Sequence, residues 1–418
     1  MTRRRGPLTR CSPGRTGPAV HEPRRRVPIA GEYDVVVVGG GIAGVAAAVA
    51  AARNGASVCL IEKQCALGGL ATLGIVTVYL PLCDGRGRQV VGGLGEELLK
   101  LSVADGSGEE VPACWRRGGD KAERARRRYR VRFNPASYLI ALERLTVEAG
   151  VKLLYDTVFC RTVRAGRRIT AVVVENKSGR SAVACRVVVD ASGDADVCSA
   201  AGERCVSWKT NVAGGWFYTL DGAGRAELVP FTLPFDQTGL GVPEGGGRGF
   251  AGDDADDVTA QVVATRQAIL RRLAELRAER GGPLHPLMVP AVPTFRMTRR
   301  LRKPVELTRD DDRRPFPDAV GRIGSWLSDG LVFDIPFGAL TAEKTDNLLA
   351  AGRCIAVDET AWPYTRVIPG CAVTGEAAGT AAAMAARPGV PVAALHLPSL
   401  QRQLRRQKVI LPRHLGPR

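Results

Sequence analysis

The chain has 418 residues, of which 45% are hydrophobic and 24% are charged, so it can bury a sizeable core and is neither a disordered nor a fibrous protein. Its net charge of +17 does not indicate nucleic-acid binding, because residues 1–30 hold eight Arg against one Glu and residues 401–418 hold five Arg and one Lys without an acid. Charge concentrated at two ends is typical of solvated tails.

Residues 1–30 combine Arg, Pro, Gly and Thr without an apolar segment, which predicts a disordered basic tail and no secretory signal. The 11 cysteines contain no C-x-x-C pair, and several lie within apolar runs. This usage favours reduced thiols and a cytoplasmic location.

The stretch from Asp34 to Glu62 predicts a strand, a glycine turn, a helix and a second strand. The strand 35–38 is a valine run, and Gly39, Gly41 and Gly44 follow it in the spacing G-x-G-x-x-G. In this pattern the first glycine permits the turn, the second lets a pyrophosphate approach the backbone, and the third lets the helix lie close to the strand. Ile42 and Ala43 open the helix, whose N-terminus attracts phosphate, and Glu62, followed by Lys63, can accept hydrogen bonds from a ribose.

A membrane span is the alternative interpretation, because residues 35–52 carry no charge and reach the minimum length for crossing a bilayer. Three consecutive glycines inside the run and the lack of an aromatic belt argue against it. We therefore expect a dinucleotide site and no membrane span.

The next segment contains a second glycine pair and an arginine-rich region. Gly68-Gly69 predicts another close approach of the backbone, and Cys65 and Cys83 fit small buried side chains better than reactive thiols. Residues 105–132 are glycine-rich and then arginine-rich, which predicts a loop and a charged, solvated surface. Its arginines are Arg116, Arg117, Arg124, Arg126, Arg127, Arg128, Arg130 and Arg132.

A helix is expected from Asn134-Pro135 to Gly150, then a strand over 151–155. Three β runs at 158–164, 169–176 and 182–189 are separated by glycine turns, which predicts a meander. The last run opens into a turn that holds Gly193 and Asp194, at the sheet edge where ligands of open α/β folds bind.

Residues 205–340 read as an inserted α+β lobe with a helix over 253–280, and the nucleotide-binding pattern resumes over 341–387. There we expect a strand at 347–351, a turn at Gly352-Arg353, and a helix from Cys371 to Ala386 that Gly370 opens. Gly375 and Gly379 would admit a strand or a ligand against this helix. Residues 388–418 are expected to form a helix and a basic tail, and residues 31–204 and 341–387 one α/β, Rossmann-like domain with a parallel sheet and a meander.

The sequence resembles FAD-dependent oxidoreductases. The segments that carry this resemblance are, in chain order, GGGIAG, Glu62, Gly68-Gly69, DASGDAD, LLAAGR and RVIPGCAVTGEAAGTAAA. They are most similar to flavoproteins allied to the heterodisulfide reductase A subunit, and more distantly to fumarate reductase and succinate dehydrogenase flavoproteins. The resemblance implies that Gly39, Gly41 and Gly44 hold the FAD pyrophosphate and that Glu62 holds the ribose. It also implies that Gly193, Asp194, Gly352, Arg353 and Gly370 lie near the cofactor.

Departures from these families limit the comparison. No cysteine run could hold an iron-sulfur cluster in this chain, and we expect no metal site. Trp362-Pro363-Tyr364 stands where the fumarate reductases carry a His-Gly pair, so a dicarboxylate substrate is not expected. Residues 22–284 contain no His, which favours FAD bound without a covalent link.

Three residues are candidates for the chemistry. Arg366 matches the substrate arginine of the distant relatives, although a phosphate or surface contact would also explain it. Arg299, in the segment FRMTRR, could be a second clamp or a structural ion pair. Tyr364 could donate a proton.

The residues downstream contain no second dinucleotide motif after a strand. Electrons must therefore come from the substrate, from a transient reductant or from a partner protein. The leading hypothesis is hydride or electron transfer between a small molecule and FAD. An electron-transfer subunit with an iron-sulfur partner is the second hypothesis, and a nucleic-acid-binding flavoprotein the third.

Overall fold

The computed structural model describes residues 25–231, 248–304, 306–386 and 390–412. The tail expected over residues 1–30 lies mostly outside these ranges, and its last two residues already belong to the first strand, β1 (Ile29–Val38). Part of the basic C-terminal tail lies outside them as well.

A mainly parallel sheet forms the centre of the molecule. Its strands run in the order β5-β2-β1-β8-β7-β6, and β16 also pairs with β8. β1 lies between β2 (Val58–Ile61) and β8 (Gly179–Asp190), so that Val35 is in register with Val58 on one side and Val187 on the other. Such a strand is buried on both faces, which explains the unbroken valine run.

The predicted meander is confirmed. β6 (Val158–Ala165) and β7 (Arg168–Asn176) pair antiparallel, and β7 pairs antiparallel with the first half of β8. The second half of β8 pairs in parallel with β16 (Leu348–Ala350). β8 therefore joins the meander to the parallel strands, and it carries the turn at Gly193 to the carboxyl edge of the sheet. β5 (Lys152–Leu154) completes the other edge.

Two helices with small side chains pack against each other over this sheet. They are α1 (Ile42–Arg53) and α9 (Ile368–Ala385). A Cβ atom at Gly375 would lie 2.3 Å from the Ala43 carbonyl oxygen, and one at Gly379 would lie 2.0 Å from the Ala47 carbonyl oxygen. The expectation of a strand or ligand at these glycines is wrong, because the backbone of α1 occupies the space.

Further helices surround this pair. The N-terminus of α2 (Gly93–Leu101) lies against α9. There the Glu376 carboxylate accepts a hydrogen bond of 2.8 Å from the Leu94 N–H. α5 (Pro135–Glu148) has the predicted Asn134 cap, with 2.9 Å from the Ala136 N–H to Oδ1. α10 (Leu397–Arg406) packs Leu400 and Leu404 into the main core, and so the predicted C-terminal helix is present.

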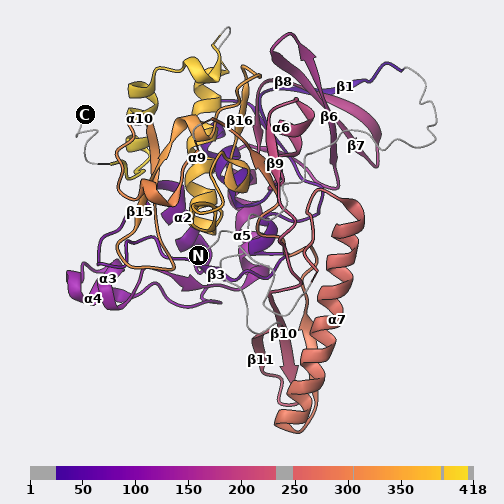
Figure 1. The fold of residues 1–418 in the computed structure, drawn as a ribbon, viewed down its shortest axis with the longest axis vertical. Coiled ribbons are helices and arrows are strands. Elements are labelled where there is room, and N and C mark those ends of the chain that lie inside the picture. The colour runs from indigo at the N-terminus through magenta and orange to yellow at the C-terminus, as the bar shows by residue number, and fades with distance from the viewer. Residues whose placement is uncertain (1–24, 232–247, 305, 387–389, 413–418) are drawn as a thin grey trace, which may run out of the picture.

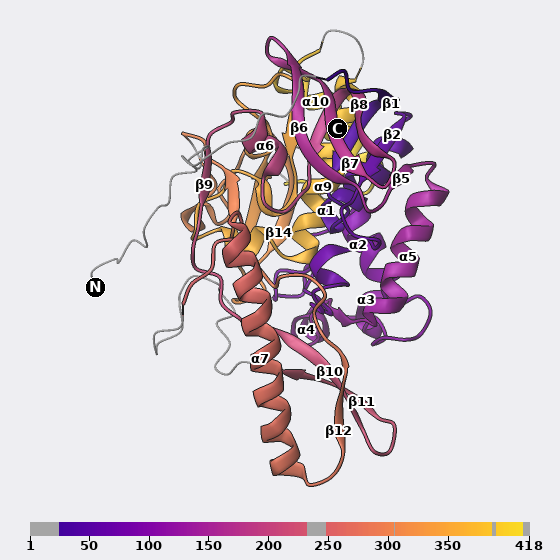
Figure 2. The ribbon, with the colours of Figure 1, turned by 90° about the vertical axis from the view of Figure 1, so that its right-hand side faces the viewer.

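A second, smaller core lies beside the sheet-centred one. It joins α7 (Ala255–Arg280), which Asp254 caps, to the antiparallel strands β10 (Trp216–Asp221), β11 (Ala226–Pro230) and β12 (Leu284–Met288). Its members include Phe217, Ile269 and Leu273. Figures 1 and 2 show α7 and these strands projecting from the end of the molecule opposite the main sheet.

Other parts of residues 205–340 pack with the main core. β14 (Ala319–Gly324) and β15 (Val332–Pro336) form a hairpin whose buried side chains join the cluster around the parallel sheet. β9 (Cys205–Ser207) and β13 (Arg299–Leu301) form the pair that connects the two cores. The remaining short elements are β3 (Val78–Tyr79), β4 (Val131–Arg132), α3 (Ala113–Arg116), α4 (Lys121–Arg126), α6 (Asp196–Ala200) and α8 (Trp362–Thr365).

Candidate functional site

The glycine turn after β1 brings three chain segments together. Gly39 has φ +102°, and a Cβ there would lie 2.4 Å from the Ala191 carbonyl oxygen. A Cβ at Gly44 would lie 1.7 Å from the Gly39 carbonyl oxygen, so this residue sets how closely α1 approaches its strand. A Cβ at Gly41 meets nothing within 4 Å. The first and third glycines are therefore required by packing, and the second faces open space.

That open space lies at the N-terminus of α1. Gly41 is the N-cap residue and, having no side chain, offers no side-chain cap to the first turn. The first N–H groups of a helix have no partner within the helix and attract anions. Gly68 pairs with Gly41 through an isolated bridge, and the Gly68 N–H donates to the Gly40 carbonyl oxygen at 2.8 Å. The second glycine pair thus forms the opposite side of the same turn.

Glu62 closes β2 next to this turn. Its carboxylate accepts hydrogen bonds from the Gly40 N–H at 2.6 Å and the Gln64 N–H at 2.8 Å, and the residue is 8% exposed. These bonds fix the carboxylate beside the glycine turn, with Lys63 and Gln64 also at the cavity wall. An acceptor held here suits a ribose hydroxyl.

A cavity of about 1130 Å³ begins at this turn and continues past the end of β8 to the start of α9. This exceeds the usual range of about 300 to 1,000 Å³ for small-molecule sites. Most of the residues that the sequence pattern singled out line it, namely Gly39, Gly41, Ile42, Ala43, Glu62, Lys63, Gly68, Gly69, Gly193, Asp194, Gly352, Arg353 and Arg366. Gly44, Gly370, Arg299 and Tyr364 do not line it.

Asp194 and Arg353 form a polar cluster in the middle of the cavity wall. Arg353 Nη2 lies 3.3 Å from Asp194 Oδ1, and its Nη1 donates to the Phe295 carbonyl oxygen. Thr298 Oγ1 donates to the Asp194 carboxylate. The cluster ties the turn after β8 to the segment that precedes β13.

The far end of the cavity lies at the N-terminus of α9. Gly352 has φ +72°, and its N–H donates to Thr374 Oγ1 at 2.9 Å. Gly370 is in the first turn of α9, where a Cβ would lie 2.1 Å from the Thr365 carbonyl oxygen, so its role is packing against α8. Ile368 and Cys371 line the cavity beside this turn.

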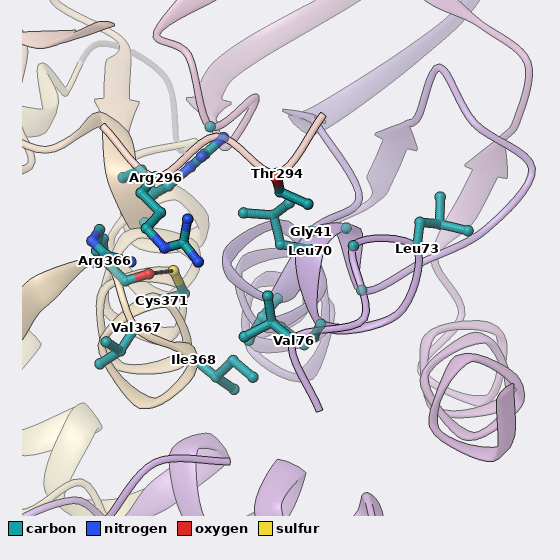
Figure 3. Close-up of a pocket in the computed structure, with 18 of the residues that line it drawn as sticks. Gly41, Leu70, Leu73, Val76, Thr294, Arg296, Arg366, Val367, Ile368 and Cys371 are labelled. Carbon is teal, nitrogen blue, oxygen red and sulfur yellow. Dashed lines mark hydrogen bonds between the residues drawn. The ribbon is translucent and has the colours of Figure 1, made fainter. Parts of the chain in front are cut away.

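Two arginines stand at this end. Arg366 follows α8 and lines the cavity, and Cys371 Sγ donates to its carbonyl oxygen at 3.2 Å. Figure 3 shows Arg366 and Arg296 on the same side of the cavity as Cys371, with Leu70, Leu73 and Val76 on the opposite side. Burial raises the pKa of the Cys371 thiol to about 11, so it is a neutral thiol at physiological pH.

Arg299 and Tyr364 lie behind the cavity wall. Arg299 Nε donates to the Asp194 carbonyl oxygen at 2.8 Å, and Nη2 forms an ion pair with Asp196 at 2.7 Å. Burial and the nearby Asp194 and Asp190 carboxylates raise the pKa of Asp196 to about 6. The positive charge of Arg299 acts to lower this pKa but does not outweigh them. Tyr364 is 4% exposed and stacks on Phe333, with ring centroids 5.0 Å apart.

The sequence pattern missed one part of the wall. Arg126, Arg128, Arg130 and Arg132 line the cavity, together with Trp326 and Trp216. Arg126, Arg130 and Arg132 are exposed, as a charged surface predicts, but the prediction did not show that this surface forms part of the cavity wall. The alternation of Arg128, Arg130 and Arg132 with the apolar residues Tyr129, Val131 and Phe133 was a signal that these three arginines share one face, but it does not tell what that face lines.

Two further features bear on the class of protein. In the described ranges, no group of three His, Cys, Asp or Glu side chains is arranged to hold a metal ion. Among the same residues, no helix has both the length and the apolar character that crossing a membrane requires.

Comparison with known proteins gives a consistent result. The family model described as FAD dependent oxidoreductase matches residues 34–211 and 251–404. A thioredoxin reductase from Ureaplasma parvum serovar 3 is 39% identical over 72 residues, which are 17% of this chain and only 23% of that enzyme.

Two solved structures of flavoenzyme-type proteins are similar to this chain at low identity. A geranylgeranyl bacteriochlorophyll reductase-like protein from Thermoplasma acidophilum is 14% identical, covering 90% of this chain and 82% of its own, with a TM-score of 0.39. A 3-ketosteroid-delta4-(5alpha)-dehydrogenase from Rhodococcus jostii RHA1 is 16% identical, covering 85% and 97%, with a TM-score of 0.37. The family match spans most of the chain and both ends of the cavity, and the chain therefore belongs to the FAD dependent oxidoreductase family, with FAD as its cofactor.

Proposed function

We propose that this enzyme transfers a hydride or electrons between a small-molecule substrate and FAD bound without a covalent link. The observation that carries the proposal is the continuity of one cavity from the Gly41 turn to the N-terminus of α9 and on to β10 and β11. A cavity of this extent has room for a dinucleotide at one end and a second molecule at the other.

The residues of the wall fit FAD. Gly41 leaves open the space that a Cβ would fill, and the first turn of α1 offers N–H donors to a pyrophosphate. Glu62 and Lys63 would hold the ribose end, and Gly193, Asp194, Gly352 and Arg353 the middle of the cofactor. When bound, FAD supplies the hydride or electron chemistry that no side chain provides.

The positions of the histidines and the state of the Cys371 thiol support non-covalent binding of FAD. His285 and His396, the histidines in the described part of the chain, do not line it. Cys371 lines it, but its raised pKa of about 11 leaves almost no thiolate to form a bond. Its thiol is also engaged with the Arg366 carbonyl oxygen.

Arg366 is proposed as the electrostatic clamp on the substrate. It stands directly before α9, whose N-terminus favours negative charge at the same end of the cavity. Arg296 shares this side of the cavity (Figure 3). A substrate group that gains negative charge would be stabilised by both guanidinium groups.

For Arg299 we propose a positioning role, because its guanidinium holds the Asp194 carbonyl oxygen and Asp196 behind the wall. Tyr364, stacked on Phe333, would support α8 and hence Arg366. A direct proton transfer from Tyr364 would require it to reach the cavity, which it does not line.

The motif resemblance to heterodisulfide reductase A flavoproteins favours a second candidate function, an electron-transfer subunit that works with an iron-sulfur partner protein. In this case the flavin would exchange electrons with the partner and the cavity wall would bind no substrate. The free cysteines of the described residues suit a reducing, cytoplasmic setting under either proposal.

Arg366→Gln separates the two candidates. Removal of a charge-assisted contact that strengthens in the transition state typically costs about 2.7 to 4 kcal/mol, or about a hundredfold to a thousandfold in rate. We expect substrate-driven flavin bleaching in a stopped-flow instrument to slow by this factor, while FAD content and reduction by dithionite stay normal. A substrate is first found by screening reductants for bleaching of the wild-type flavin.

Arg117→Gln is the matched control, since Arg117 is exposed and does not line the cavity. Its rate should equal that of the wild type. An unchanged rate in Arg366→Gln would remove the clamp from the proposal and favour the electron-transfer subunit.

A further inference from the structure

One wall of the cavity carries a row of arginines. The arginine row consists of Arg126, Arg128, Arg130 and Arg132, which all line the cavity. Tyr129, Val131 and Phe133, which alternate with Arg128, Arg130 and Arg132, are only 0%, 0% and 2% exposed, whereas Arg127 is exposed and does not line the cavity. From Arg128 onward, alternate side chains therefore point to the core and to the cavity, and Arg126 lines the cavity from the end of α4.

The backbone of the row is held in place by the residues around it. Tyr129 Oη donates to Glu96 Oε1 at 2.9 Å and its ring stacks on Trp115 at 5.1 Å between centroids. Trp115 Nε1 donates to the Arg127 carbonyl oxygen at 2.6 Å. β4 pairs with β3 through Val131 and Tyr79. The segment is thus a fixed part of the wall.

The row carries more positive charge than its surroundings neutralise. Arg128 is engaged with Asp329 and with the Trp326 carbonyl oxygen, and Arg132 lies 3.8 Å from Glu109 across an exposed surface. In the part of the chain that the structure describes, Arg126 and Arg130 form no ion pair. A cavity wall that is lined by one sign of charge concentrates the electric field and attracts ligands of the opposite sign.

The carboxylates of the cavity wall do not supply this anion. Glu62 is held by backbone N–H groups at the ribose end, and Asp194 is held by Thr298 and Arg353. Both lie on segments that belong to the cofactor turns. The charge of the row is therefore available to a bound molecule.

Apolar and aromatic residues accompany the row. Leu80, Pro81 and Trp326 line the cavity next to it, and Trp216, Leu228 and Pro230 line it from β10 and β11. Trp326 also connects the row to the Arg366 side, because its Nε1 donates to the Pro363 carbonyl oxygen in α8 at 3.1 Å. The wall can hold an apolar body and anionic groups at the same time.

We propose that the substrate is a small molecule with an apolar body and at least two anionic groups, carboxylate or phosphate, one of which binds the arginine row. The inference rests on the proposed function and names its substrate class. A small molecule fits better than a nucleic acid, because the row lines a cavity that also contains apolar side chains.

The test uses the FAD-loaded protein and defined probes. Naphthalene-2,6-dicarboxylate and 1-naphthyl phosphate are titrated by calorimetry, with naphthalene-2-carboxylate and neutral naphthalene-2,6-dimethanol for comparison. We expect a dianionic probe to bind at least about tenfold more tightly than the monoanion and the diol. Preference for one dianion over the other identifies carboxylate or phosphate as the recognised group.

A pair of double variants with the same change of charge locates the site. Arg126→Gln/Arg130→Gln should weaken binding of the preferred dianion by about tenfold or more. Arg117→Gln/Arg127→Gln alters two exposed arginines of the same region that do not line the cavity, and it should leave affinity within about twofold.

Three results would overturn the inference: equal affinity for the diol and the dianions, equal losses in both double variants, or displacement of the probe by a single-stranded DNA oligonucleotide at a lower concentration than the probe itself. The last result would make the row a nucleic-acid surface. FAD content is measured in each sample. Retained FAD without anion preference rejects only this inference, whereas wild-type protein that cannot hold FAD rejects the proposed function.

Discussion

Gly41 and Gly44 lie three residues apart, and the structure gives them opposite tolerances to a side chain. A Cβ at Gly44 would lie 1.7 Å from the Gly39 carbonyl oxygen, where contacts below 3.0 Å essentially never occur, so the backbones would have to separate by about 1.3 Å. At Gly41 nothing lies within 4 Å, and φ −64° with ψ 178° suits any residue. Gly44→Ala should therefore damage the fold, and Gly41→Val should damage cofactor binding.

The magnitudes follow from these contacts. Overpacking typically costs about 1 to 3 kcal/mol, and the clash at Gly44 is between backbone groups that cannot rotate away, so we expect about 3 kcal/mol or more. The unfolding midpoint of the apoprotein should fall by about 3 °C or more, because the unfolding entropy of a chain of this length is about 0.9 kcal/mol per kelvin. Valine at the N-cap of α1 costs less than about 1 kcal/mol, which predicts a small change for Gly41→Val.

The assay is thermal unfolding of both apoproteins, followed by measurement of FAD bound after reconstitution. Gly41→Val should unfold close to the wild-type temperature and retain under about a tenth of the wild-type FAD, because its side chain occupies the space that a pyrophosphate needs. Normal FAD content in stable Gly41→Val protein would refute the placement of the cofactor. A Gly44→Ala protein as stable as the wild type would refute the packing argument.

The remaining predictions concern buried charge. Burial raises the pKa of Glu376 from an ordinary 4.5 to about 8, although its hydrogen bond from Leu94 and the nearby Arg53 act in the opposite direction. Between these two pKa values the folded protein holds a proton that the unfolded chain releases. The contribution of Glu376 to the free energy of unfolding is therefore greatest below about pH 4.5 and is lost as the pH rises through 8. The total loss is roughly 5 kcal/mol at most. Glu376→Gln should flatten this dependence in urea unfolding measured from pH 5 to 8.5, and an unchanged slope would count against it. Arg299→Gln should lower the unfolding midpoint and slow the reaction much less than Arg366→Gln, because Arg299 holds Asp194 and Asp196 from behind the wall; equal losses of rate at equal stability would argue for direct contact with substrate.

The parts of the fold that the sequence predicted are those set by local chemistry. A valine run, three glycines at fixed spacing and Asn134 before Pro135 each impose their structure within a few residues. β1, α1, β2, the meander and α5 therefore appear where they were expected. The glycine turn and Glu62 come together for the same reason.

The parts that could not be predicted depend on distant neighbours. Gly375 and Gly379 indicate a close approach, but their spacing does not say that α1 is the partner. In the segment Thr298-Arg299-Arg300, only the position of β13 decides that Arg300 is buried against Glu306 and that Arg299 faces Asp196.

The place of the arginine row in the cavity wall also could not be predicted from the sequence. Its residues have the composition of a solvated surface, and only the fold brings them beside Trp326 and opposite β10 and β11. The alternation with Tyr129, Val131 and Phe133 was present in the sequence, but it does not reveal what the charged side faces.

Direct identification of the bound cofactor tests the central claim most simply. Wild-type protein is purified, its absorption spectrum is recorded, and the supernatant after acid precipitation is analysed for FAD. We expect yellow protein that releases close to one FAD per chain into the supernatant, because the cavity wall offers a cradle for the dinucleotide and Cys371 is a neutral thiol. Flavin that stays with the precipitated chain would contradict non-covalent binding, and colourless protein that takes up no added FAD would contradict the account as a whole.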